Sequence, residues 1–125
     1  MDFLSTFSTA ASGMKAQTRR LQTISQNMAN ADTPGFKRKV LTFEEAVDGK
    51  GVAVAGMTLD RTEAPKIFDP NNPLADADGY YEGSNVSMVL EVADAREASR
   101  SYEANLQMFD QARRMSSALL DLIRR

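Results

Sequence analysis

An acidic cluster beside a glycine, Asp76-Ala77-Asp78-Gly79, invites comparison with a calcium loop. An EF-hand loop needs glycine at its sixth position and acidic ligands at its first and twelfth. If Gly79 is the sixth residue, Leu74 stands first and Asn85 twelfth, and neither is acidic. The cluster therefore predicts turns, in which Asp and Gly are common, rather than a metal site.

Carboxylates elsewhere in the middle of the chain could in principle supply a general acid and a general base. They are Asp60, Glu63, Asp69, Asp78 and Glu82, and nothing in their spacing singles out a pair. The chain has no histidine and no cysteine, which excludes imidazole acid–base chemistry, thiol nucleophiles and Cys/His zinc sites. Phosphate-binding glycine loops and serine nucleophile elbows are also missing from the sequence. We therefore expect a protein that is not an enzyme and uses no cofactor.

The charge balance narrows the class of partner. With 15 basic and 17 acidic residues, the 125-residue chain has a net charge of −2, whereas general nucleic-acid and membrane-surface binders are usually basic. The sequence does not open like a signal peptide, and no apolar run approaches the roughly 20 residues of a transmembrane helix. We expect no nucleic-acid partner, no small-molecule substrate and no transmembrane segment. If the protein leaves the cytoplasm, we expect a route other than the common signal peptide.

Glycine and proline divide the chain into three parts. All four prolines and six of the seven glycines lie between Pro34 and Gly83. Both flanks can therefore form long helices, and the middle cannot. The sequence predicts a mainly α protein with an N-terminal helix (1–31), an extended, turn-rich insert (32–84) and a C-terminal long helix (85–125). We expect the two helices to pair as an antiparallel, coiled-coil-like hairpin around a small β/loop insert.

Within the insert, a weak apolar alternation predicts a small hairpin or edge strand over Val52, Val54, Met57 and Leu59. The stretch 64–85, rich in Pro, Asn, Asp and Gly, predicts a loop held by Ile67, Phe68 and two tyrosines.

Both flanks carry apolar residues at steps of three and four, the stripe of an amphipathic helix. The N-terminal stripe includes Phe7, Met14, Leu21 and Met28 at spacings of seven, with Ile24. The C-terminal stripe includes Ala98, Tyr102, Leu106, Phe109, Leu119 and Ile123, and Asn85 or Ser87 can supply the N-cap. A helix of about 38 residues would span roughly 57 Å. Because it outreaches its shorter partner, we expect other copies or other chains to cover part of its stripe.

The sharpest corner of the chain lies at Thr33-Pro34-Gly35. A residue before proline is extended, so the first helix must end by about residue 31 or 32, and Pro34-Gly35 fits the centre of a type II turn. Asn27 and Asn30 can bond the free carbonyls of the last helical turn or cap it. Phe36 is expected to fold onto a helix, and the cations at 37–39 to lie near the negative helix end.

One stretch reads Ser25-Gln26-Asn27-Met28-Ala29-Asn30, followed by Thr33-Pro34-Gly35-Phe36-Lys37. It resembles the signature near the N-terminus of the bacterial flagellar rod and hook proteins. The stretches 69–80 and 98–105 resemble the proximal-rod members in particular. The resemblance covers nearly the whole chain in the right order.

The resemblance implies a structural subunit of the flagellar basal-body rod, the hollow shaft that crosses the periplasm. Its partners would be other copies of itself, other flagellar rod proteins and the flagellar type III export apparatus, which would export it without a cleaved signal peptide. By the same resemblance, the corner between helix and insert is formed by Asn27, Ala29, Asn30, Thr33, Pro34 and Gly35, with Phe36 after it. Tyr102 and Asn105 would make helix-pairing or inter-subunit contacts.

Two alternatives remain open at the level of sequence. One is another rod or hook-base axial protein with the same N-terminal signature, although the loop at 69–80 argues against it. The other is a soluble cytoplasmic coiled-coil adaptor or export chaperone, which would explain the apolar stripes but not the corner.

Overall fold

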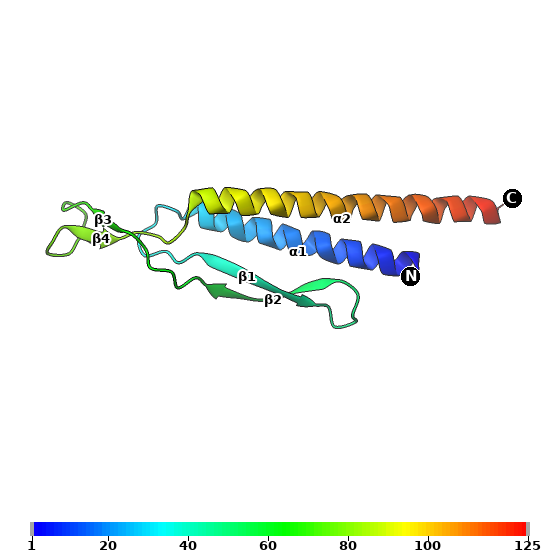
Figure 1. The fold of residues 1–125 in the computed structure, drawn as a ribbon, viewed down its shortest axis with the longest axis horizontal. Coiled ribbons are helices and arrows are strands. Elements are labelled where there is room, and N and C mark those ends of the chain that lie inside the picture. Colours follow the sequence, from blue (N-terminus) through cyan, green and yellow to red (C-terminus); the bar gives the residue numbers. More distant parts are fainter. Residues whose placement is uncertain (1, 125) are drawn as a thin grey trace.

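The structure is a computed structural model that describes residues 2–124. A long helix, α1 (Phe3–Ala29), leads into a two-stranded antiparallel hairpin, β1 (Lys39–Glu45) and β2 (Val52–Leu59). A smaller hairpin follows, β3 (Lys66–Phe68) with β4 (Tyr80–Glu82), and the chain returns through the longest element, α2 (Met88–Ile123). The chain is mainly α, with two long helices packed against each other and small β elements between them (Figure 1).

Polar side chains cap both helices. The Asp2 carboxylate accepts the backbone N–H of Ser5 at 2.6 Å, which starts α1. Ser87 is the N-cap of α2, one of the two candidates from sequence, and its hydroxyl accepts the N–H of Leu90. Such caps satisfy N–H groups that have no partner within the helix.

The helices run in opposite directions, and small side chains line the face where they meet (Figure 1). We call this face the seam; on α1 it buries Ala10 and Gly13, and on α2 Ala98 and Ala112, one helical row with Asn105, which lies against Gly13. Small residues let two helix backbones approach closely. Larger side chains then lie at the edges of the helix–helix contact. The rings of Phe7 and Phe109 meet edge to face there, with centroids 4.9 Å apart.

The apolar residues that the sequence places at spacings of seven on α1 lie beside the seam. Phe7, Met14, Leu21 and Met28 are all half-buried, whereas Ile24 is 5% exposed. The seam of α2 follows another row spaced by seven: Glu91, Ala98, Asn105, Ala112 and Leu119. Glu91, Ala98 and Ala112 are buried, Asn105 is half-buried, and Leu119 is 46% exposed.

The larger hairpin lies along α1. Its strands pair from Lys39 opposite Leu59 to Glu45 opposite Val52, with an irregularity between Thr42 and Phe43. The sequence predicts β2 correctly but not β1, whose alternation is obscured by polar residues. The Ser12 hydroxyl accepts the N–H of Val52 at 3.1 Å, which fixes the hairpin to α1.

The stretch predicted as a loop over 64–85 contains the β3–β4 hairpin. The rings of Phe68 and Tyr80 pack 5.1 Å apart across it, as part of the hydrophobic support that the sequence predicts. Gly79 packs against Phe68, since a Cβ there would come within 2.8 Å of the ring.

α2 extends beyond the start of α1 at the far end of the molecule (Figure 1). Since Phe7 meets Phe109 and α1 starts at Phe3, α2 outruns its partner from about residue 115 onward. We call residues 115–123 the overhang; it continues the helix for about 13 Å. Within residues 2–124, neither helix is apolar enough over a sufficient length to cross a membrane.

Candidate functional site

The corner after α1 forms the turn that the sequence predicts. Gly35 has a φ of 73°, and the Phe36 N–H donates to the Thr33 carbonyl at 3.1 Å. These are the positive φ and the i to i+3 hydrogen bond of a type II turn, with proline at its second position. The Gly35 N–H also donates to the Glu82 carbonyl at 3.2 Å, so the corner is joined to the end of β4.

Asn27 has a role that differs from its predicted one. Its side chain does not bond the last carbonyls of α1; Nδ2 donates to the Lys39 carbonyl and Oδ1 accepts the Lys39 N–H, both at 2.9 Å. The physical reason is that β1 passes the end of α1 with its outer backbone groups unpaired, and a carboxamide matches one donor and one acceptor. Asn27 is 1% exposed. Inside the protein, its side chain makes the two hydrogen bonds to Lys39 that a neighbouring strand would otherwise make.

Asn30 behaves as predicted. Its Nδ2 donates to the Gln26 carbonyl at 2.8 Å, in the last turn of α1, and its Oδ1 accepts the Thr33 hydroxyl at 3.1 Å. Asn30 thus satisfies one free helix carbonyl and connects the helix end to the turn.

Arg38 is the centre of an ion cluster that sequence reasoning missed. Its Nε donates to Glu91, Nη2 lies 2.9 Å from Asp94 Oδ2, and Nη1 lies 3.7 Å from Asp60 Oδ2. Glu91 is fully buried, and its Oε2 has no hydrogen-bond partner within the described chain. Arg20 of α1 joins the cluster, 3.7 Å from Asp94.

The electrostatics of the cluster favour the charged guanidinium. Burial acts against the charge of Arg38, but the Glu91 hydrogen bond and the charges of Glu91, Asp94 and Asp60 together raise its pKa. The sequence predicts the cations at 37–39 near the end of α1, and this is wrong for Arg38. The acids of α2 offer it several carboxylates, and one helix end offers only a partial charge. Lys37 likewise lies 2.9 Å from Glu82 rather than at the helix end.

Asn85 connects the same region from the other side. Its Oδ1 accepts the Arg38 backbone N–H at 2.6 Å, and its Nδ2 donates to the Asp60 carbonyl at 2.9 Å. We refer to Asn27, Arg38, Asn85 and Glu91 as the junction, because these four side chains hold the helix ends and the insert together. Arg38 and Glu91, which are 53 positions apart in the chain, meet there, so no local pattern could have shown it.

The acidic loop near Asp76 forms turns, as predicted. One Asp76 oxygen accepts the N–H groups of Asp78 at 2.9 Å and Tyr80 at 3.0 Å. The hydrogen bond from the Tyr80 N–H has the largest effect on the pKa of Asp76 and lowers it; burial acts against this, and the hydrogen bond from the Asp78 N–H lowers the pKa further. Among residues 2–124, no group of three or more acidic side chains is arranged to hold a metal ion.

The structure places the predicted corner and helix residues at different depths. In the corner, Asn27 is buried, Asn30 and Phe36 are half-buried, and Ala29, Thr33, Pro34 and Gly35 are exposed. In the helices, Ile24 and Ala98 are buried; Phe7, Met14, Leu21, Met28, Tyr102, Asn105 and Phe109 are half-buried; Leu106, Leu119 and Ile123 are exposed.

The overhang carries a concentration of exposed large apolar side chains. Its uncovered residues are Met115, Leu119, Leu120, Leu122 and Ile123, the last of which is 78% exposed. The seam face of α2 therefore continues past the end of α1 without a partner in the same chain. A soluble monomer rarely exposes such a surface, which is typical of an assembly interface.

Two long paired helices, a corner held by a polar junction and an exposed apolar helix end are typical of a structural protein that assembles with other chains. Known families identify it further. The family described as flagella basal body rod protein matches residues 7–37, and the flagellar basal body rod FlgEFG protein C-terminal family matches residues 77–122.

Individual relatives agree with the family matches. The flagellar basal-body rod protein FlgC of Agrobacterium fabrum is 40% identical over 126 residues, covering 92% of this chain and 91% of the relative. That of Salmonella typhimurium is 34% identical over 132 residues, covering 98% of each. The chain belongs to the flagellar basal-body rod proteins of the FlgC type. It is a structural subunit of the basal-body rod and not an enzyme.

Proposed function

We propose that this chain is a proximal-rod subunit that self-assembles, with other flagellar rod proteins, into the drive shaft that crosses the periplasm. The observation that carries the proposal is the overhang, an apolar helix end that no element of the same chain covers. In the assembled shaft, helices of neighbouring subunits cover this surface. The seam then continues as a coiled-coil-like bundle through successive subunits.

Burial of these side chains supplies the cohesion between subunits. Each large apolar side chain that moves from water into an interface contributes roughly 1.5–3 kcal/mol when fully buried. Contacts between different patches of identical subunits propagate rather than close, so modest contacts repeated along the shaft make it stiff.

The predicted residues divide between two roles. The corner residues Asn27, Asn30, Thr33, Pro34 and Gly35 set the direction in which the insert leaves α1. The exposed residues Leu106, Leu119 and Ile123 make contacts between subunits, while Ala98 and Ile24 hold the two helices of one subunit together.

Export through the flagellar type III apparatus accounts for arrival in the periplasm. This step requires a chain that unfolds readily. One property of the chain supports it: the seam contains small side chains rather than a deep core.

The proposal is tested by deleting the gene and examining motility and purified basal bodies by electron microscopy. We expect cells that do not swim and basal bodies with membrane rings but no completed rod, with both restored by the native gene. Complementation by Leu119→Asp plus Ile123→Asp should fail although the subunit is exported, since charge in the overhang prevents burial. The matched control Leu4→Asp changes an exposed apolar residue of α1. Flagella that assemble normally with the overhang variant would contradict the proposal.

A further inference from the structure

The smaller hairpin is joined to the rest of the subunit only at its base. We call residues 66–82 the finger. Among the described helices and strands, β3 and β4 pack only on each other, and Figure 1 shows them at the end of the molecule where α2 begins. A hairpin with three residues in each strand and no further packing is marginally stable in water. The finger therefore needs a partner from outside its own subunit.

One face of the finger carries two uncovered aromatic rings. Phe68 and Tyr80 stand directly opposite each other across the strands, so their side chains share a face. The ring centroids are 5.1 Å apart, and the two residues are 61% and 40% exposed. Exposed aromatic residues that gather on one face are typical of a surface that binds another protein.

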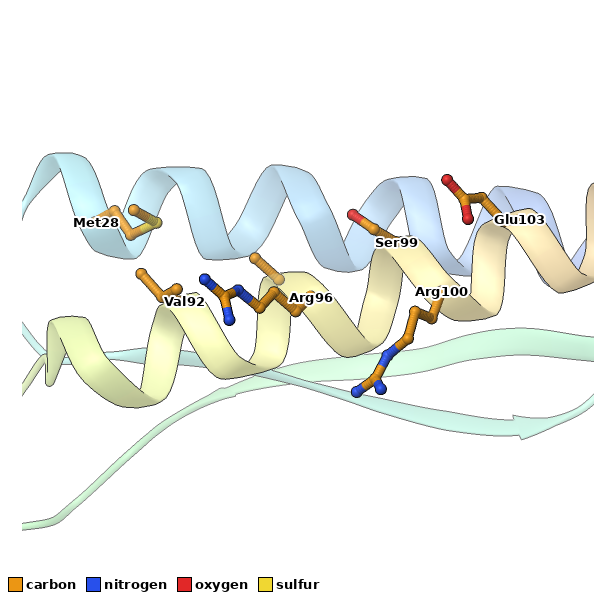
Figure 2. A pocket seen from close by; sticks show the side chains of 7 residues that line it. Met28, Val92, Arg96, Ser99, Arg100 and Glu103 are labelled. Carbon is orange, nitrogen blue, oxygen red and sulfur yellow. The ribbon is translucent and has the colours of Figure 1, made fainter.

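The outer face of α2 near its start offers two arginines beside apolar side chains. We call residues 88–100 the α2 strip. Two adjoining hollows of about 550 Å³ each share Val92, Arg96 and Arg100 as lining residues, which places these three side chains on one face. Figure 2 shows them along α2, with Met28 of α1 beside Val92. Val89, which lines the second hollow, is 79% exposed.

The two arginines of the strip have no acidic partner. Arg96 and Arg100 are exposed and form no ion pair within residues 2–124, whereas Arg20 and Arg38 each contact two or more carboxylates. Arg96 and Arg100 are also four residues apart on one helix, where like charges repel each other. An exposed guanidinium without a carboxylate is free to lie over an aromatic ring in a cation–π contact.

The spacing of the rings matches the spacing of the arginines. Side chains four residues apart on a helix have Cβ atoms about 5–6 Å apart, and the two ring centroids are 5.1 Å apart. Each ring can therefore lie against one guanidinium while the ring edges cover the valines of the strip. On both partners, the side chains that meet in this way come from a single face.

The charges of the two surfaces are also opposite. The loop 69–79 of the finger contains no basic residue and three aspartates: Asp69, Asp76 and Asp78. None of the three forms an ion pair within the described chain. Asp69 follows Phe68 directly and Asp78 lies two residues before Tyr80, so both carboxylates come within about 10 Å of a docked strip, the Debye length near physiological ionic strength. At that range the attraction does not depend on the direction in which each aspartate points.

We propose that the finger of one subunit docks onto the α2 strip of a second copy of this chain, with its two rings against Arg96 and Arg100. The inference deepens the proposed function and rests on its side-by-side assembly, in which helices of neighbouring subunits cover the overhang. Finger and strip lie at the same end of the subunit, so a sideways neighbour needs an axial stagger and no inversion (Figure 1). Because the finger and the strip are different patches, the contact repeats from copy to copy.

A contact of this size is weak by itself. Stable interfaces bury about 1,200–2,000 Å² of surface, which is more than one short hairpin supplies. In an assembled shaft the subunits are held at a high effective concentration, so the contact forms there. The test therefore uses basal bodies rather than dilute subunits.

The test replaces Phe68 in the full-length chain with a photo-crosslinking phenylalanine analogue, in a strain that lacks the native gene. We expect illuminated basal bodies to contain a product with the mass of two chains, in which mass spectrometry joins residue 68 to residues 88–100. The matched control carries the analogue at Tyr81, the neighbouring aromatic on the opposite face of β4, and should not reach the strip. The reciprocal label at Val89 should crosslink to residues 66–82, and it decides the question if the Phe68 variant does not assemble.

Substitution of the arginines tests the recognition itself. Arg96→Gln plus Arg100→Gln should lower the yield of finger-to-strip crosslinks about tenfold, because it removes two cation–π contacts and the attraction to the aspartates. Arg113→Gln plus Arg114→Gln, the same change on the same helix outside the strip, should leave the yield unchanged. All four arginines are exposed, so neither double variant should change the unfolding temperature of the subunit.

The outcomes separate this inference from the proposed function. Basal bodies that support swimming but crosslink residue 68 elsewhere would overturn the docking of finger on strip and leave the rod function standing. A crosslink to a chain of different mass, with none to this chain, would overturn the choice of partner. An unchanged yield with Arg96→Gln plus Arg100→Gln would overturn the pairing of rings with arginines. Complete, swimming flagella in the deletion strain itself would count against both the inference and the proposed function.

Discussion

Gly13 of α1 lies directly against the side-chain amide of Asn105 of α2. A Cβ atom at Gly13 would lie 2.5 Å from Asn105 Oδ1 and 2.7 Å from Nδ2, closer than side chains approach one another. A glycine that weakens the isolated helix thus permits the close crossing of the two helices.

Gly13→Ala should therefore destabilise the subunit by roughly 1–2 kcal/mol, although alanine favours helix by about 1 kcal/mol. The methyl group displaces the Asn105 amide, which donates to the Ser101 carbonyl at 2.8 Å. In an Asn105→Ala background the same change should be neutral or stabilising. Urea unfolding of the four variants in a double-mutant cycle checks this, and equal effects of Gly13→Ala in both backgrounds would contradict the contact.

Asn27→Ala should cost about 2–3 kcal/mol of unfolding free energy, since it leaves both backbone groups of Lys39 without a partner at a buried site. The Lys39 amide should also exchange its hydrogen much faster. Asn30→Ala is the control, because it removes hydrogen bonds from a more exposed asparagine. Equal losses of unfolding free energy in the two alanine variants would contradict the role of Asn27 as the hydrogen-bond partner of the Lys39 backbone.

Gly35→Val should impair assembly and swimming, because a β-branched residue resists the φ of 73°. The strain is roughly 1–3 kcal/mol. No atom lies within 4 Å of a Cβ at Gly35, so the effect is conformational and not a clash. Gly35→Asn, which adopts positive φ more easily, should retain most swimming on soft agar. Normal motility of the valine variant would contradict the assignment of a type II turn at Gly35.

Arg38→Met should destabilise the subunit by about 3–5 kcal/mol, because Glu91 would remain buried without a counter-charge. The double variant Arg38→Met plus Glu91→Met should recover much of this loss, since it removes the buried charge as well. Thermal unfolding followed by circular dichroism measures both. A double variant as unstable as the single one would show that the pair contributes more than mutual neutralisation.

Stability should decline in acid partly through Asp60. The hydrogen bonds from the side chain and then the backbone of Thr62 lower the pKa of Asp60 below its ordinary value of 3.8. The folded state therefore binds its proton less readily than the unfolded state. The contribution of Asp60 to the unfolding free energy is fully present above its pKa in the unfolded state, and it is lost as pH falls through its pKa in the folded state. Thr62→Val should flatten the decline in unfolding free energy below about pH 4; an unchanged acid limb would exclude Asp60 as its cause.

Local sequence patterns were sufficient for the helices, the corner turn and the class of function. Proline and glycine confine the insert to the middle of the chain, apolar residues at steps of three and four require helices, and Pro34-Gly35 selects a turn with positive φ at Gly35. These features depend on neighbours within a few residues, and backbone sterics act at that range. The family signature around the corner is equally local, which is why the rod class could be predicted from it.

Only the tertiary structure decided which partners the polar residues choose and which apolar residues stay uncovered. Asn27 bonds Lys39, and Arg38 reaches Glu91, because the insert folds back past the helix ends. The seam uses Ala10, Gly13 and Ala98 rather than the largest apolar residues, since close approach of two backbones depends on both helices at once. The overhang exists because α2 outruns α1 in space, and that relation is fixed by packing between residues about a hundred positions apart.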